Sequence, residues 1–172
     1  MIPRNTVSVS FSFWLTAIGL SASVHAADSC QPEADGVGKL ATTPTHIYST
    51  VDNGIDNKST TIEMLYINGA VYGKVGDKWI RTALTPQELV GKEQDKQKGG
   101  SCHYLKDESI DGDKAAVYSV QSKSGEAGAR LWISKRNGLP LREEMEIDSG
   151  VRGHNSHLFM RYEYVNVHEP RI

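Results

Sequence analysis

A calcium-like pattern of oxygen-bearing side chains occurs once in the chain. Asp107, Ser109 and Asp111 alternate as calcium ligands would, and Gly112 follows at the place of a sharp turn. Calcium loops of this kind need a bidentate glutamate at their twelfth position, which here is Tyr118. We therefore interpret Asp111 and Gly112 as a hairpin turn and predict no calcium site.

The histidines show no pattern that would bind a metal or serve as a catalytic base. His154 and His157 are three residues apart, and this odd spacing places them on opposite faces of a strand. His46, His103 and His168 stand beside aliphatic or aromatic residues, with no carboxylate at a telling spacing. We predict no metal and no cofactor.

Motifs of known enzyme classes are missing from the sequence. It contains no Gly-x-Ser-x-Gly nucleophile elbow, no phosphate loop, no dinucleotide fingerprint and no His-Glu-x-x-His zinc motif. A hydrolase ranks third among the functions considered, because no nucleophile and base can be paired. We predict that the protein is not an enzyme.

The N-terminal residues have the pattern of a secretory signal. A cationic start at Arg4 precedes an apolar stretch from Val7 to about Ala22, and small residues flank His25 at the cleavage positions. This predicts a signal peptide over residues 1–26 and one mature domain over residues 27–172. The alternative is an uncleaved anchor, which the short, Ser- and Thr-broken stretch disfavours.

The mature chain is predicted to be soluble and to bind no nucleic acid. The formal charge is −2, and removing Arg4 makes it −3, whereas nucleic-acid binding needs a basic stripe. No second apolar stretch is long enough to span a membrane.

Both cysteines lie in the mature part, and an even count in an exported chain predicts a disulfide between Cys30 and Cys102. It would pin the N-terminal segment onto the body. The alternatives are free thiols, or acylation of Cys30, for which Ala27, Asp28 and Ser29 do not form the required lipobox.

Tight turns with alternating residues on both sides predict an antiparallel meander of eight or nine strands. Asn68–Gly69 has the strongest two-residue hairpin signal, since both positions of a type I′ turn need positive φ. Turns are also expected at Gly76–Asp77, Asp111–Gly112 and Asn137–Gly138. The expected strands are Pro44–Val51, Thr60–Ile67, Ala70–Val75, Lys78–Leu84, Cys102–Ile110, Lys114–Gln121, Ala129–Ser134, Leu139–Asp148 and a last strand that contains Leu158–Tyr164.

Period-two alternation is clearest in the last two strands. In the first of these, the apolar residues Leu139, Leu141, Met145 and Ile147 share one face, and Arg142, Glu144 and Glu146 share the other. In the last strand, Leu158, Met160, Tyr162 and Tyr164 oppose Arg161 and Glu163. One face of the sheet is charged, so helices must cover the other.

Two helices are predicted. Pro32–Thr43 has apolar residues at helical spacing, although Gly36 and Gly38 each weaken it by about 1 kcal/mol. The second begins at the capping box Thr85–Glu88 and runs to about Lys98. Its few apolar residues predict a solvated helix on the rim of the sheet.

Aromatic and methionine side chains are unusually frequent on the strands. They would fill an ordinary core, or they would line an apolar cavity on the concave face of a curved sheet. The candidate lining residues are Met64, Tyr66, Trp79, Trp132, Met160, Tyr162 and Tyr164.

Several segments resemble small proteobacterial periplasmic proteins of the LolA- and LolB-like lipoprotein-carrier superfamily. The most specific runs from Trp132 to Arg142, where a Trp-Ile-Ser strand and a short turn precede Gly-Leu-Pro-Leu-Arg. The others are Pro44–Tyr48, Glu63–Asn68, Lys78–Trp79, Thr85–Glu88, Asp107–Gly112 and Tyr162–Val167.

The resemblance implies a mainly β (α+β) fold, a LolA-like half-barrel in which helices cover a curved antiparallel sheet. In the carriers this space holds acyl chains. It therefore implies a periplasmic binding protein whose concave face holds a hydrophobic ligand, such as an acyl chain or the lipid of a lipidated protein. The alternative is a non-catalytic structural or protein-interaction module of the cell envelope with a filled core.

Overall fold

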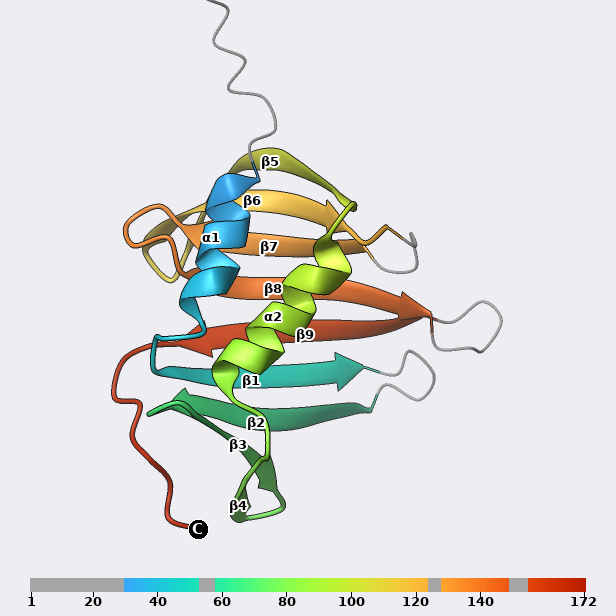
Figure 1. Cartoon of the computed structure of the whole chain (residues 1–172). Helices are drawn as coiled ribbons and strands as arrows, with labels where there is room; N and C mark the ends of the chain where they lie inside the picture. The colour runs from blue at the N-terminus through green and yellow to red at the C-terminus, as the bar shows by residue number, and fades with distance from the viewer. Residues whose placement is uncertain (1–29, 53–57, 124–127, 149–154) are drawn as a thin grey trace, which may run out of the picture.

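The computed structural model describes residues 30–52, 58–123, 128–148 and 155–172 as an open antiparallel sheet of nine strands with two helices on one face (Figure 1). The mainly β fold predicted from the sequence is confirmed. The predicted signal peptide at residues 1–26 lies outside the described residues, as does His154.

The strands follow the predicted meander closely. They are β1 (Thr45–Asp52), β2 (Ser59–Ile67), β3 (Ala70–Val75), β4 (Lys78–Arg81), β5 (Ser101–Ile110), β6 (Asp113–Gln121), β7 (Gly128–Ser134), β8 (Pro140–Asp148) and β9 (Asn155–Glu163). Their order in the sheet is β4-β3-β2-β1-β9-β8-β7-β6-β5. Because β9 pairs with both β1 and β8, the two halves of the chain form one continuous sheet.

The predicted hairpin turns have the backbone that their residues favour. Asn68 and Gly69 have φ values of 52° and 71°, and Asp111 and Gly112 have 49° and 83°. Positive φ at both central residues is the requirement of a type I′ turn, which Asn-Gly and Asp-Gly adopt most easily. The calcium-like segment is thus a hairpin turn between β5 and β6, as predicted.

Both helices lie on the concave face of the sheet. The first, α1 (Gln31–Lys39), is shorter than predicted and packs on β7 and β8. A Cβ atom at Gly36 would lie 2.9 Å from both the Gly138 carbonyl oxygen and the Ile133 Cδ1 atom. The glycine that weakens the helix therefore also allows its close approach to β7.

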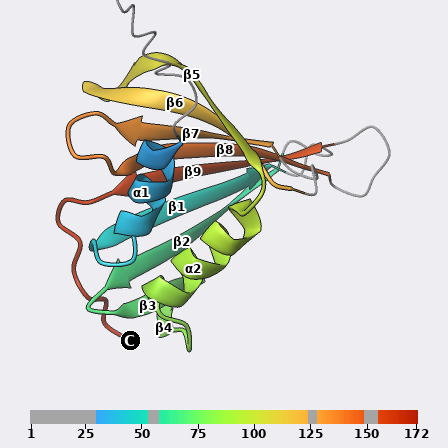
Figure 2. The same ribbon diagram turned by 45° about the horizontal axis from the view of Figure 1, so that its top comes forward.

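The second helix, α2 (Pro86–Gln97), begins at the predicted capping box. The Thr85 hydroxyl accepts a hydrogen bond from the Glu88 amide at 3.2 Å, and the Thr85 amide donates to Glu88 Oε2 at 2.7 Å. Its predicted place on the rim is wrong, because α2 crosses the concave face (Figure 2). Val90 is buried in the core, and one apolar stripe was enough to dock an otherwise polar helix.

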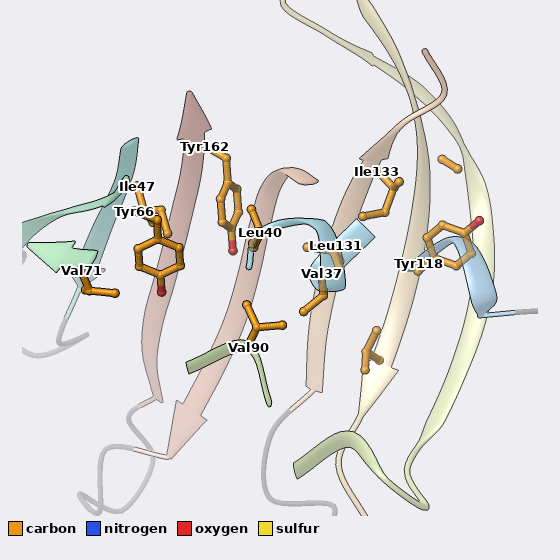
Figure 3. Packing of buried hydrophobic residues seen from close by; sticks show 12 residues of the cluster. Val37, Leu40, Ile47, Tyr66, Val71, Val90, Tyr118, Leu131, Ile133 and Tyr162 are labelled. Atoms are coloured by element: carbon orange, nitrogen blue, oxygen red, sulfur yellow. The ribbon is translucent and has the colours of Figure 1, made fainter. Parts of the chain in front are cut away.

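The main hydrophobic core joins the concave face of the sheet to the two helices (Figure 3). It comprises Val37, Leu40, Ile47, Tyr66, Val71, Val90, Ala116, Tyr118, Val120, Leu131, Ile133 and Tyr162. Two smaller apolar clusters lie elsewhere, one around Tyr72 and one around Trp132. The helices thus bury the apolar concave face, although two residues predicted on that face differ: Leu141 packs on the Trp132 cluster, and Ile147 is 37% exposed.

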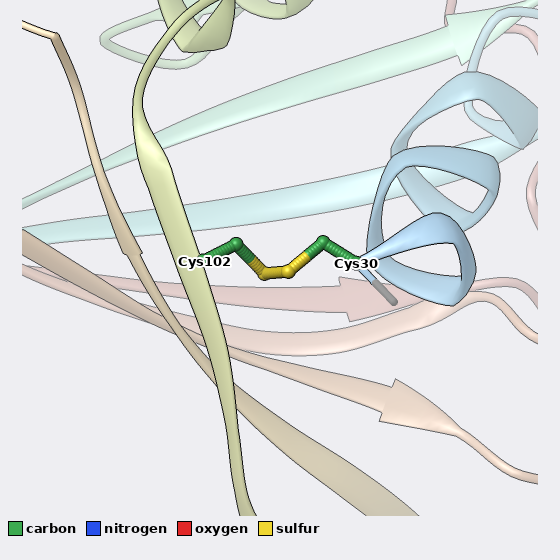
Figure 4. Close-up of a disulfide and its surroundings, with 2 residues drawn as sticks. All are labelled: Cys30 and Cys102. Atoms are coloured by element: carbon green, nitrogen blue, oxygen red, sulfur yellow. A yellow bond between two sulfur atoms is a disulfide. The ribbon is translucent and has the colours of Figure 1, made fainter. Parts of the chain in front are cut away.

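The predicted disulfide is present (Figure 4). Cys30 precedes α1 and Cys102 lies in the edge strand β5; their Cα atoms are 5.9 Å apart, and the two residues are 72 positions apart in sequence. It therefore attaches the start of α1 to the far edge of the sheet.

Replacing both cysteines by serine is expected to lower the free energy of unfolding by about 2–4 kcal/mol, because the unfolded chain regains the freedom of a long loop. For a domain of this size, the melting temperature would fall by roughly 5–15 °C. Thermal unfolding of the oxidised protein and the double variant measures this. Quantitative thiol labelling of the unreduced native protein would contradict the pairing.

Candidate functional site

A cavity of about 360 Å³ lies between the concave face of the sheet and the two helices. Its walls are mainly apolar, with a few polar side chains contributed mostly by the helices. The residues around it are Glu33, Val37, Leu40, Ile47, Met64, Tyr66, Leu89, Val90, Glu93, Lys96, Gln97, Val120, Ala129, Leu131, Glu143, Met145, Leu158, Met160 and Tyr162.

The strand register brings four of the predicted lining residues into this cavity. Ile47 pairs with Met64 on one side and with Tyr162 on the other, so the three form a row across neighbouring strands. Tyr66 and Met160 lie two positions along from Met64 and Tyr162, and all four line the cavity. Period-two alternation is what places them on one face.

Tyr164 lies beside the cavity and is not among the residues that line it. It is partly buried against the main core, and its hydroxyl donates a hydrogen bond to the carbonyl oxygen of Pro140. This contact attaches the segment after β9 to the start of β8.

Trp132 lies on the opposite, convex face, which corrects its predicted place in the lining. Leu131 and Ile133 belong to the concave core, so the residue between them must point the other way. The Trp132 indole is 3% exposed, and its Nε1 donates to Glu108 Oε2 at 3.0 Å. The Arg142 guanidinium lies 4.8 Å from the ring centroid.

Trp79 is also outside the cavity. It packs on the small cluster of Leu65, Ile67, Ala70 and Tyr72, near the β4 edge. Leu65 alternates with Met64 and Tyr66, so this cluster covers the other face of β2. The aromatic content alone carried no information about which face each ring would occupy.

The polar residues of the cavity were not predicted, although Glu143 had a signal in the sequence. Strict alternation places it between Leu141 and Met145 on the apolar face of β8. A register shift at Trp132 and Ile133 instead moves Leu141 to the convex cluster, while Glu143 and Met145 face the cavity. The position of the Glu143 carboxylate between apolar residues of one strand was therefore the sequence signal for a polar group in the cavity.

The Glu143 carboxylate accepts a hydrogen bond from a neighbouring tyrosine, and its surroundings raise its pKa. The Tyr162 hydroxyl donates to Glu143 Oε2 at 2.9 Å. Burial raises the pKa of the Glu143 carboxyl to about 7, and the nearby charges of Glu93 and Glu33 contribute to the rise. The pKa of Tyr162 is also raised, first by burial and then by Glu143.

Glu33 supplies a second buried carboxylate, from the first turn of α1. It is 3% exposed, and its Oε1 atom has no hydrogen-bond partner. Burial raises the pKa of Glu33, and a hydrogen bond from Gln97 opposes that rise. A buried acceptor without a donor lowers the stability of the folded protein, so its presence calls for an explanation such as a ligand.

The cavity continues into a groove of about 800 Å³ beside the end of α2. The groove and the cavity share Glu93, Lys96, Gln97, Glu143 and Met145, besides Val120 and Ala129. The other residues that line the groove include the exposed Asp95 and Lys98. Because the groove opens to solvent and shares residues with the cavity, we interpret it as the entrance to the cavity.

The described residues contain no group of three or more His, Cys, Asp or Glu side chains arranged to hold a metal ion. Within the same part of the chain, neither helix has the length and apolar composition needed to cross a membrane.

Solved structures with a similar fold share little sequence with this chain. LprF from Mycobacterium bovis is 12% identical, with a TM-score of 0.47 over 84% of this chain and 98% of that protein. A LolA superfamily protein from Nitrosomonas europaea is 9% identical, with a TM-score of 0.34 over 78% and 91% of the two chains. In the MucA/MucB complex from Pseudomonas aeruginosa, the matched chain is 13% identical, with a TM-score of 0.44; the match covers 75% of this chain and 56% of that one.

No protein-family model and no curated protein sequence matches this chain. The likeness to the solved structures therefore concerns the fold alone. The half-barrel architecture expected from the sequence is present as an open, curved sheet of nine strands with two helices over its concave face.

Proposed function

We propose that this protein is an exported, periplasmic, non-catalytic binding protein that holds the apolar part of a lipid-like ligand in the cavity between the sheet and α2. The ligand class is an acyl chain, either free or attached to a lipidated protein. The supporting observation is the cavity itself, about 360 Å³ of space lined mainly by apolar side chains. Its size lies within the range of ~300–1,000 Å³ usual for small-molecule sites.

The composition of the walls suits a flexible apolar guest. Met64, Met145 and Met160 line the cavity from three strands, and unbranched methionine side chains adjust to ligands of different shape. Each is only partly buried, although each projects from a strand toward the core. An occupant would cover the apolar surface that these side chains leave unburied.

The disulfide supports export, because such bonds persist in oxidising compartments. The signal-like pattern of residues 1–26 and this disulfide together support the proposal that the mature protein is periplasmic. The alternative, a structural or interaction module with a filled core, is less favoured because the concave face retains the cavity.

An environment-sensitive apolar dye tests the proposal. It is expected to bind the purified protein with a stoichiometry near one, and decanoate is expected to displace it. Met160→Lys should abolish dye binding, because a cationic side chain would fill and charge the apolar wall. Ile80→Lys is the control, since Ile80 is 52% exposed on the edge strand β4 and is not among the residues that line the cavity.

Circular dichroism must show that both variants are folded. Saturable binding that survives in Met160→Lys would exclude this cavity as the site. Failure of the wild-type protein to bind dye or any amphiphile would favour the filled-core module.

A further inference from the structure

Three carboxylates from three separate elements meet at the cavity. Glu33 comes from α1, Glu93 from α2 and Glu143 from β8. All three side chains line the same cavity, and the charges of Glu33 and Glu93 both raise the pKa of the Glu143 carboxyl. The convergence of distant segments means that this acidic end is built by the tertiary structure.

One of these carboxylates presents an acceptor that nothing in the described protein satisfies. Only 3% of the Glu33 surface is exposed, and its Oε1 atom has no hydrogen-bond partner. The Glu33 side chain lines the cavity, so a cationic group at this end of the cavity would lie beside the Glu33 carboxylate. A ligand bearing N–H groups would satisfy it.

Among the described residues that line the cavity, Lys96 is the only lysine or arginine, and it already pairs with Glu93. Lys96 Nζ lies 3.0 Å from Glu93 Oε2, and the lysine side chain is 71% exposed. It therefore neutralises Glu93 at the mouth and leaves Glu33 and Glu143 without a cationic partner among the cavity residues. Glu143 accepts one hydrogen bond, from the neutral hydroxyl of Tyr162.

We propose that the cavity selects cationic amphiphiles, molecules with a protonated amine at one end of an apolar chain. The ammonium group would lie between Glu33 and Glu143, and the chain would lie along Met64, Met160 and Leu158. This inference deepens the proposed function and rests on it, because it assigns the head group of the ligand that the cavity holds.

The physical reason is that carboxylates removed from water need a compensating charge. An ion pair with hydrogen bonds to both carboxylates offsets part of their desolvation, and such charge-assisted bonds are about twice as strong as neutral ones. A ligand carboxylate would add a fourth negative charge to the same space, so a free fatty acid would still bind through its chain but more weakly than an amine of equal length. A neutral alcohol would gain only the apolar contacts and one ordinary hydrogen bond.

Binding should depend on pH through the groups that face Glu143. In the cavity these are Glu33 from α1, Glu93 and Lys96 from α2, Tyr66 from β2 and Tyr162 from β9, and the adjoining groove adds Asp95, Lys98 and Lys123. The β7 residues that line the cavity, Ala129 and Leu131, are apolar. Between pH 6 and pH 8 Glu143 becomes largely ionised, while an alkylamine stays protonated. Amine affinity should therefore rise by up to about tenfold over this range.

Decylammonium, decanol and decanoate test the head group at constant chain length. Each would displace the apolar dye from the wild-type protein at pH 8, below the concentration at which it aggregates. Decylammonium is expected to bind at least tenfold more tightly than decanol, and decanoate more weakly than decanol.

Glu143→Gln and Glu33→Gln are each expected to reduce the preference for the amine over the alcohol by about tenfold, with decanol affinity unchanged. Glu143→Gln should also remove most of the rise between pH 6 and pH 8. Glu146→Gln is the matched control, because Glu146 lies on the same strand and is exposed outside the cavity.

The two proposals fail differently. Equal binding of decylammonium and decanol, or tightest binding of decanoate, would overturn the cationic preference and leave the apolar site intact. An amine preference that persists in both glutamine variants would also overturn it. Failure of all three amphiphiles to bind would overturn the proposed function along with the inference.

Discussion

Glu143→Gln is expected to stabilise the protein at pH 8 by about 3 kcal/mol and to have almost no effect near pH 4.5. The pKa of the Glu143 carboxyl, which lies in the partly enclosed cavity, is raised from 4.5 to about 7, with desolvation as the main cause. One pKa unit corresponds to about 1.4 kcal/mol, so keeping this group ionised in the fold costs roughly 3 kcal/mol. Glutamine carries no charge and still offers an oxygen to the Tyr162 hydroxyl.

The sign follows from proton binding. Between pH 4.5 and 7 the folded protein keeps a proton on Glu143 that the unfolded chain has released, so raising the pH through this window lowers the free energy of unfolding. The wild-type protein should therefore lose stability as the pH rises from 4.5 to 7, with little further change from this group above 8. The variant should lack this part of the pH dependence.

Urea unfolding of both proteins at pH 4.5, 6, 7 and 8 measures the difference directly. Glu146→Gln provides the control for removing a charge from an exposed position of β8. If the free energies of unfolding of Glu143→Gln and the wild type differ by the same amount at every pH, the raised pKa of Glu143 is contradicted. A loss of stability in Glu143→Gln at pH 8 would contradict the cost of the buried charge.

Trp132→Ala is expected to lower the free energy of unfolding by about 3–5 kcal/mol, the usual cost of truncating a buried aromatic side chain. The indole is 3% exposed and packs with Ala115 and Val117 on the convex face. Its removal would also take the donor from Glu108 and the ring from beneath Arg142. Dye binding should survive at temperatures where the variant stays folded.

Trp132→Phe separates these contributions, since it keeps an apolar ring and loses the N–H group. We expect it to cost about 1–2 kcal/mol, between the wild type and Trp132→Ala. Denaturant unfolding and dye titration of the three proteins provide the comparison. Unchanged stability in Trp132→Ala would show that the ring is solvated, and selective loss of dye binding by the folded variant would place it in the cavity.

The strands and turns were predictable because their causes are local. Asn68–Gly69 and Asp111–Gly112 adopt positive φ with little strain, and the alternating residues on either side leave one pairing that buries the apolar face. The capping box at Thr85 likewise determined where α2 begins. The face of each β8 residue was less predictable, since the register shift that moved Leu141 depends on pairing with β7.

By itself, the sequence determined the mainly β fold, the hairpins, both helices and the Cys30–Cys102 pair, because each depends on short-range patterning or on a count of two cysteines. The tertiary structure alone decided that α2 crosses the concave face and that Trp132 lies outside it. It also brought Glu33 and Glu143 together from positions 110 residues apart. Such a site depends on how the helices pack on the sheet, and no pattern within one short segment shows which residue of a distant segment will lie beside it.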